Sequence, residues 1–377
     1  MFIAAVDSDG AFDYLLKTTR GLEKLDTANV HQKLKDFYKD FISIDGIDAE
    51  RFMRPPFGLL GDSAFVAKYD HLSAADRLRQ MKVSADNRPF LEALIQSYGL
   101  AGLEDVGFID VARTMAHAGL SAVGMREKNG TYSLGNGGTT ALARCLLDEF
   151  HGHLQFSAQV TKISQADQRV RVTLRGGREI LARYVICTIP LNVLHTIEFS
   201  PPMSRLRQEA INKGHIGRGG KMLFSLEPGT HPFLASAGSP CDFTLSYPKA
   251  VTHDGDVKGT VAFVLSDSSL PSEDPEQVQA KYAELVPGAT ISSYTFHDWR
   301  SDPFAQGTWT SYPTGFESKY YSELQKRHGN IFMASSDWAE GWRGYIDGAI
   351  EQGMLAAQGV GDFCSAREVE HDAFRLL

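Results

Sequence analysis

The stretch from Ala334 to Gly353 joins an acid, three aromatic side chains and four glycines in a loop that leads directly into a helix. The apolar run 331–333 before it is typical of a buried strand. After it, apolar and small residues recur at helical spacing. The first turn of such a helix offers free N–H groups and a positive dipole end, which suit a ligand that carries or gains negative charge. An ordinary strand-loop-helix crossover would show the same pattern.

Two other places carry side chains that could act on a small molecule. Lys221 follows the glycine-rich loop 217–220 and opens an apolar strand, where a lysine is most often a solvated flank. Trp299 and Trp309 flank the loop 300–308, where aromatic side chains usually serve packing. The pattern alone leaves both interpretations open.

Common catalytic motifs of other enzyme classes are missing from the sequence. It has no H-E-x-x-H or G-x-S-x-G, which gives little support to a metallohydrolase or a serine hydrolase. The glycine clusters 135–138 and 217–221 lack the spacing of a P-loop. The four cysteines lie far apart, so neither a zinc site nor a disulfide framework is predicted.

Composition indicates an ordinary globular protein with room for two domains in its 377 residues. The net charge of -8 argues against a general binder of nucleic acid or anionic membranes. No apolar run approaches the length of a membrane span or a signal peptide. We therefore expect a soluble, cytoplasmic chain with no nucleic-acid or membrane partner. The final residues do not form the S-K-L peroxisomal address, although a peroxisomal location stays open.

The first 120 or so residues are predicted to be mostly helical, and the following part is predicted to alternate strands and helices. Helices are expected at 24–41, 73–82, 87–98 and 104–117. A glycine loop should open an amphipathic helix within 131–150. A further helix should begin after Asp274, with Pro275 in its first position, and stop at Pro287 and Gly288.

Alternating apolar residues predict β structure from 155 to 190. A first strand should contain Phe156, Val160 and Ile163, and a second should run over 170–174 before the turn 175–178. A third is predicted from Ile180 to Ile189, with its last part buried on both faces. Segments 221–226 and 259–265 are further strand candidates.

The stretch at 334–353 resembles the C-terminal signature of the flavin-dependent amine oxidases, and most closely that of the fungal monoamine oxidases. The shared pattern is a short strand, an acid, a Trp-x-Gly-Tyr element, and a helix that opens Asp-Gly-Ala. Earlier landmarks occur in the family's order: Tyr132 with Gly137 and Gly138, then the segments 187–194 and 199–202. The resemblance covers about residues 35–360, with 131–202 and 296–353 as its specific blocks.

The resemblance implies a binding site for FAD. Asp337, where the family usually has Glu, would hydrogen-bond the ribityl chain, and the backbone N–H of Ile346 would meet the N1–C2=O edge of the flavin. Val160 would hold the adenine through its backbone, and Trp299 would lie beside the flavin. Animal monoamine oxidases carry a cysteine that bonds to FAD where this chain has Thr308, so noncovalent FAD is implied.

The resemblance also implies the reaction. Trp309 and Tyr345 would form two walls of an aromatic cage that holds an amine before the flavin. Lys221 would sit near flavin N5 and help O2 capture an electron. A primary amine would lose hydride to the flavin, the imine would hydrolyse to an aldehyde, and O2 would become H2O2. An L-amino-acid oxidase is an alternative, and it would need an arginine such as Arg300 or Arg343 for the substrate carboxylate.

The implied architecture is an α/β (α+β) protein of two interleaved domains. A substrate domain of helices and an antiparallel sheet would take 1–129, its helical part, and 206–302. A Rossmann-like FAD domain would take 130–205 and 303–377. That domain would be incomplete, because the sequence has no G-x-G-x-x-G.

Three explanations for the missing dinucleotide-binding arm stay open. The chain could be a shortened form of a working oxidase, or a homodimer or partner chain could supply the dinucleotide-binding half. It could also be a diverged, non-catalytic relative.

Overall fold

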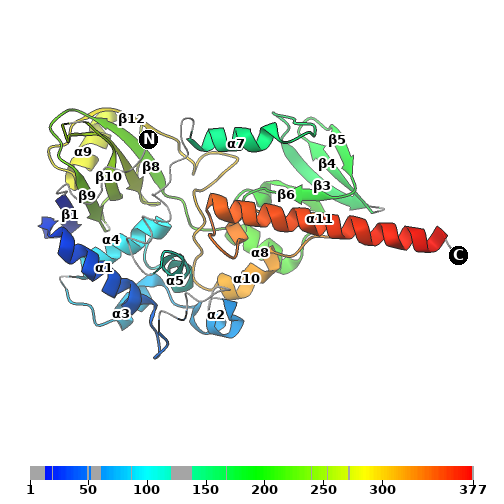
Figure 1. Ribbon diagram of the computed structural model, residues 1–377, viewed down its shortest axis with the longest axis horizontal. Coiled ribbons are helices and arrows are strands. Elements are labelled where there is room, and N and C mark those ends of the chain that lie inside the picture. The colour runs from blue at the N-terminus through cyan, green and yellow to red at the C-terminus, as the bar shows by residue number, and fades with distance from the viewer. Residues whose placement is uncertain are drawn as a thin grey trace.

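A computed structural model describes residues 13–375, apart from positions 19, 49–50, 52–60, 86, 120–137, 167, 239, 253 and 271. Two bodies lie side by side (Figure 1). One contains a large sheet with α1–α5 and α9, and the other contains two smaller sheets with α7, α8, α10 and α11. None of the described helices is both long and apolar enough to cross a lipid bilayer. The predicted domain boundaries at 129/130, 205/206 and 302/303 stay a prediction.

The large sheet has seven described strands in the order β12-β8-β11-β10-β9-β1-β2. Its neighbours pair antiparallel except for β1 and β9, which run parallel. The strands are β1 Asp13–Thr18, β2 Gly21–Leu25, β8 Gly220–Leu226, β9 Phe233–Ala237, β10 Phe243–Val251, β11 Val257–Val264 and β12 Ile291–Phe296.

Alternation along β8 determines which of its side chains face the apolar core and which face the opposite side of the sheet. Met222, Phe224 and Leu226 are buried in a core cluster shared with helix α9 (Pro275–Leu285). Lys221 and Leu223 therefore point to the other face of the sheet, because successive side chains of a strand alternate.

The predicted helices of the first part are present with small shifts. They are α1 Thr27–Ile42, α3 Ala74–Gln80, α4 Arg88–Gly99 and α5 Phe108–His117, and a short α2 spans Ser63–Tyr69. Together with β1 they enclose one apolar core. The expectation of a mostly helical start overlooked β1 and β2. Strand β1 pairs with β9, more than 200 residues away, so local pattern could not reveal it.

The second body holds a four-stranded sheet, β5-β4-β3-β7, and a parallel pair, β13-β6. Its strands are β3 Val160–Ala166, β4 Arg169–Leu174, β5 Glu179–Ala182, β6 Val185–Cys187, β7 Glu198–Ser200 and β13 Ile331–Met333. Its helices are α7 Gly138–Asp148, α8 Arg205–Lys213, α10 Glu317–Leu324 and α11 Ile346–Arg375, and short 3-10 turns span Leu194–Thr196 and Ser336–Trp338.

Three strand predictions in this body were wrong. The single strand predicted over 180–189 is two strands in different sheets, since β5 pairs with β4 and β6 pairs with β13. Burial on both faces is also contradicted, because Ile186 of β6 is 41% exposed. Phe156 lies outside β3 and is 81% exposed.

Large apolar side chains of α7, α11 and the adjoining strands face outward. Helix α7 is amphipathic, as predicted, yet none of its side chains is buried. The predicted glycine loop before it lies outside the described residues, as do Tyr132 and Gly137. We call this group the exposed apolar set: Leu146, Leu147, Phe150, Leu154, Phe156, Ile180, Leu181, Ile186, Ile346, Ile350, Met354 and Leu355.

Candidate functional site

Three segments that are distant in sequence meet backbone to backbone. The N–H of Thr308 donates to the carbonyl of Gly217 at 2.8 Å, and a Cβ on Gly217 would lie 1.9 Å from the carbonyl oxygen of Trp309. Gly344 adopts φ +78°, and a Cβ there would lie 2.9 Å from the nitrogen of Thr310. Glycine is therefore required where segments 215–221, 306–311 and 336–346 pack together.

Asp337 ties these segments to a fourth. It is buried, and its carboxylate accepts the N–H of Leu191 at 2.7 Å and the hydroxyl of Thr310. The hydroxyl of Tyr312 donates to the Asp337 carbonyl. A carboxylate has about four lone-pair positions, so two protein donors leave room for another. The ribityl contact predicted for Asp337 stays a prediction, and its observed role is to join loops.

Lys221 and Trp309 lie together in the structure. The Lys221 ammonium lies 4.9 Å from the ring centres of both Trp309 and Phe263, and the two rings meet edge to face at 6.0 Å. The Trp309 indole N–H donates to the carbonyl of Tyr98 at 2.8 Å, which fixes the ring. Burial, and secondarily the charge of Lys249, lowers the pKa of Lys221. A cation held against aromatic faces is thus available to a developing negative charge.

Tyr345 and Ile346 stand at the start of α11. The Tyr345 ring lies 5.1 Å from that of Trp342 in an edge-to-face arrangement, and Ile346 is 48% exposed. A Cβ on Gly348 would lie 2.4 Å from the Trp342 carbonyl, so glycine lets the loop fold back onto the first turn. Because Gly344 contacts Thr310, Tyr345 is held close to the segment that carries Trp309.

Trp299 contacts a residue of its own loop, and Val160 lies in a strand of the second body. Trp299 is 48% exposed, and its ring meets the ring of His297 edge to face with 4.2 Å between their centres. The Trp299 carbonyl accepts the N–H of Gly307. Val160 begins β3 and packs partly buried against the core of the second body. The roles predicted for both toward FAD stay predictions.

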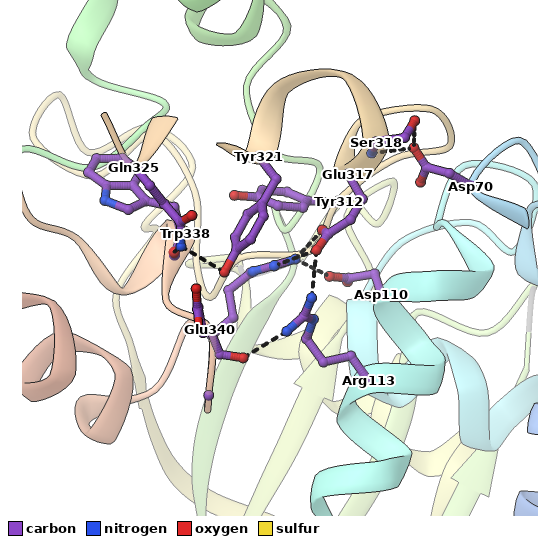
Figure 2. Close-up of polar contacts among 12 residues, drawn as sticks. Asp70, Asp110, Arg113, Tyr312, Glu317, Ser318, Tyr321, Gln325, Trp338 and Glu340 are labelled. Carbon is purple, nitrogen blue, oxygen red and sulfur yellow. Dashed lines mark hydrogen bonds and ion pairs between the residues drawn. The ribbon is translucent and has the colours of Figure 1, made fainter. Parts of the chain in front are cut away.

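A group of buried charges next to the site was missed by the sequence. We call Asp110, Arg113, Glu317 and Arg343 the buried ion cluster. Arg343 donates twice to the Glu317 carboxylate, at 2.6 and 2.9 Å, and Arg113 donates to the same carboxylate at 2.6 Å. Figure 2 shows Arg113 reaching from α5 to Glu317 on α10 and to the Glu340 carbonyl. Through Arg113, the cluster joins the loop before Tyr345 to helix α5, which belongs to the body with the large sheet.

Charge pairing sets the protonation of this cluster. Burial alone would raise the pKa of Glu317, but the charges of Arg343 and Arg113 outweigh it and lower that pKa to about 2. Burial raises the pKa of Asp110, with Arg343 opposing. Glu317 is therefore ionised and paired. Glu317 and Arg113 are 204 residues apart, and no spacing pattern in the sequence signals their contact.

Neither arginine considered for a substrate carboxylate is free to bind one. Arg343 is buried against Glu317, and Arg300 donates to three carbonyls within 266–270 and to Asp298. Both side chains are used inside the protein, which removes the support they would give to an L-amino-acid oxidase.

Known proteins resemble this chain over most of its length. A model of the flavin containing amine oxidoreductase family matches residues 7–361. Pseudooxynicotine dehydrogenase of Pseudomonas sp is 29% identical, and nicotine dehydrogenase of Pseudomonas putida is 26% identical, over 85% and 82% of this chain. The chain spans 64% of the length of each of these two enzymes.

Solved structures share the fold. A redesigned putrescine oxidase superposes with a TM-score of 0.75 at 17% identity, covering 93% of this chain and 81% of that one. Cyclohexylamine oxidase from Brevibacterium oxydans gives 0.72 at 15% identity, covering 94% and 81%. Because the family model covers most of the sequence, the chain belongs to the flavin-containing amine oxidoreductase family.

Proposed function

We propose that this chain carries the amine-binding and flavin-facing part of an FAD-dependent oxidase that converts a primary amine to an aldehyde through an imine. The observation that carries the proposal is the Lys221 ammonium held 4.9 Å from the rings of Trp309 and Phe263, beside the loop that ends in Tyr345. The proteins similar to this chain include a nicotine dehydrogenase and a putrescine oxidase, which supports an amine as the substrate class.

The residues present fit the ring end of a flavin. The close contacts at Gly217 and Gly344 bring three segments together. The first turn of α11, which follows one of these segments, offers N–H groups without intrahelical partners. Ile346 and Asp337 would hold the cofactor, and Thr308, whose hydroxyl donates to Gly217, offers no thiol for a covalent bond. When bound, the flavin supplies the acceptor for the hydride of the amine and passes electrons to O2.

The chain's own side chains then have separate tasks. Trp309 and Tyr345 hold the neutral amine by stacking against it and point its α carbon at the cofactor. The Lys221 ammonium, held against the rings of Trp309 and Phe263, stabilises negative charge that builds up on oxygen. The described site presents no dedicated general base, so the amine binds in its neutral form.

The nucleotide end needs more protein than these residues supply. Val160 would contact the adenine, while the exposed apolar set on α7 and α11 leaves a surface that another segment would cover. We propose that this segment is a dinucleotide-binding unit, from the same polypeptide or from a partner chain. A cytoplasmic location, with a peroxisomal one left open, completes the proposal.

Spectroscopy and peroxide release on the purified chain test the proposal. A flavin absorbance spectrum after incubation with FAD, together with H2O2 formed from a panel of primary amines, supports it. The matched variant Trp309→Ala should keep the fold and lose most of the turnover, while Trp299→Ala should lose less. A colourless protein that releases no peroxide with any amine, even after addition of a dinucleotide-binding segment, would identify a non-catalytic relative. Turnover of L-α-amino acids alone would favour the L-amino-acid oxidase instead.

A further inference from the structure

A second lysine lies on the same face of the large sheet as Lys221. In the sheet register Lys221 pairs with Phe263, and Val261, two residues earlier, pairs with Tyr247 of β10. Lys249 follows Tyr247 by two residues, across a bulge that interrupts the alternation, and the contact of its ammonium with the Tyr247 ring places it on the same side. Figure 1 shows β8 and β10 within this one sheet. We call these residues, with Trp309, the lysine face.

Ring contacts connect the two lysines in a continuous row. The Lys249 ammonium lies 5.3 Å from the ring centre of Tyr247, whose ring lies 6.0 Å from that of Phe263. Phe263 in turn lies 4.9 Å from the Lys221 ammonium. Two aromatic rings thus separate Lys249 from the lysine beside Trp309. Lys249 stands at the far end of an aromatic strip, away from the reacting end.

Among the described residues, no carboxylate forms an ion pair with Lys221 or Lys249. Burial lowers the pKa of both, and Lys249 adds to the effect at Lys221. Both side chains are nonetheless exposed, so each ammonium is open to a ligand. Two positive charges on one face favour a ligand that brings negative charge.

We infer that Lys249 selects the substrate, favouring primary amines whose far end carries a carboxylate over amines of equal length that end in a second ammonium. This inference rests on the proposed amine oxidation and names the substrate class for the same site. The neutral amine lies between Trp309 and Tyr345, its chain follows Phe263 and Tyr247, and its carboxylate meets Lys249. A distal ammonium at that place would be repelled.

A three-substrate comparison tests the inference. 6-Aminohexanoate, hexylamine and 1,6-diaminohexane share the reacting group and differ at the far end, and a four-carbon series repeats the test at shorter reach. For the wild type we expect kcat/KM to be roughly tenfold higher for the amino acid than for the diamine. Lys249→Glu should reverse that order, Lys249→Met should level it, and Lys249→Arg should retain it. Lys213→Glu on α8 is the control of equal net charge and should change nothing.

Calorimetric binding of the same three compounds, on the same preparations, gives a readout that does not need turnover. The wild type should bind 6-aminohexanoate more tightly than hexylamine, and Lys249→Glu should not. Equal selectivity of wild type and Lys249→Glu, or an equal shift in Lys213→Glu, would overturn the inference. If no compound is oxidised, the proposed function fails and the binding order still decides the role of Lys249. Absence of any binding preference in the wild type would overturn it as well.

Discussion

The buried ion cluster and the lysine face treat charge in opposite ways. In the cluster, Arg343 and Arg113 converge on Glu317, and all three side chains are buried. On the lysine face, Lys221 and Lys249 contact aromatic rings instead of carboxylates. Paired charges deep in the protein leave little free energy for a ligand, because each has already regained its lost hydration from a partner.

The comparison separates charges that stabilise the fold from charges that are available to bind a ligand. Removing one member of the cluster leaves an uncompensated charge in the interior, which should destabilise the fold. Removing a lysine from the face takes away a charge without orphaning another, which should change binding and catalysis instead. The comparison therefore predicts that stability and activity respond separately to substitutions in the two regions.

Glu317→Gln should have the largest effect on stability. It leaves two buried guanidinium groups without their carboxylate, so we expect a loss of about 3–5 kcal/mol in the free energy of unfolding. Urea denaturation followed by circular dichroism measures it. Glu284→Gln, an exposed position on α9, is the control and should change stability little. A Glu317→Gln protein as stable as the wild type would contradict the stabilising role assigned to the buried ion cluster.

Acid should reproduce that loss in the wild type. The pKa of Glu317 is lowered from 4.5 to about 2, so its contribution is complete above about pH 4.5 and disappears as the pH falls toward 2. The lost stabilisation is roughly 3 kcal/mol. The difference in unfolding free energy between wild type and Glu317→Gln, measured at intervals from pH 7 to 3, should therefore shrink below pH 4.5. Glu317 is among the charges that raise the pKa values of Asp110 and Asp70, so these two carboxyl groups add their own pH dependence to the difference.

Lys221→Met should separate activity from stability. Loss of the cation beside Trp309 should lower amine turnover by a factor on the order of 100, while unfolding free energy should stay within about 0.5 kcal/mol of wild type. Peroxide assays and urea denaturation of one preparation measure both. If Lys221→Met lost several kcal/mol and kept its turnover, Lys221 would belong with the structural charges.

Ser318→Ala should give the smallest effect. Asp70 is buried and accepts both the N–H of Ser318, at 2.8 Å, and its hydroxyl, at 2.6 Å (Figure 2). The substitution removes one of these bonds and should cost about 1 kcal/mol. Thermal denaturation measures it. The control is Ser301→Ala, since exposed Ser301 donates its hydroxyl to the half-buried Asp298. A loss as large as that of Glu317→Gln would show that hydrogen bonds alone, without an opposite charge, hold the two bodies together.

Local chemistry made several elements predictable. Helix α9 begins at Pro275 because Asp274 accepts the N–H groups of Glu276 and Gln277, and all of these lie within four residues. Gly288, with φ +83°, follows shortly after the end of this helix at Leu285. The glycines at 217 and 344 were recognised as part of unusual loops, and the backbone contacts that require them explain why. Such features depend on neighbours in sequence, so a sequence reveals them.

Distant pairing made other elements unpredictable. The apolar segment 180–189 has one continuous pattern, yet β5 joins a hairpin partner close by and β6 joins β13 about 150 residues on. Strand β1 depends on β9 in the same way. Apolar pattern shows that a segment can form a strand but does not name the strand beside it.

By itself, the sequence determined the family, the kinds of side chain at the flavin-facing loop, and the helix and strand starts that local hydrogen bonds and glycines control. Tertiary structure decided what the charges do. Arg343 was considered for a substrate carboxylate, but its pairing with Glu317 gives it a structural role. No sequence pattern singles out Lys249, and the sheet brings it onto the same face as Lys221. The reason is physical. The effect of a charge depends on the partners and the burial that distant segments supply, and sequence spacing records neither.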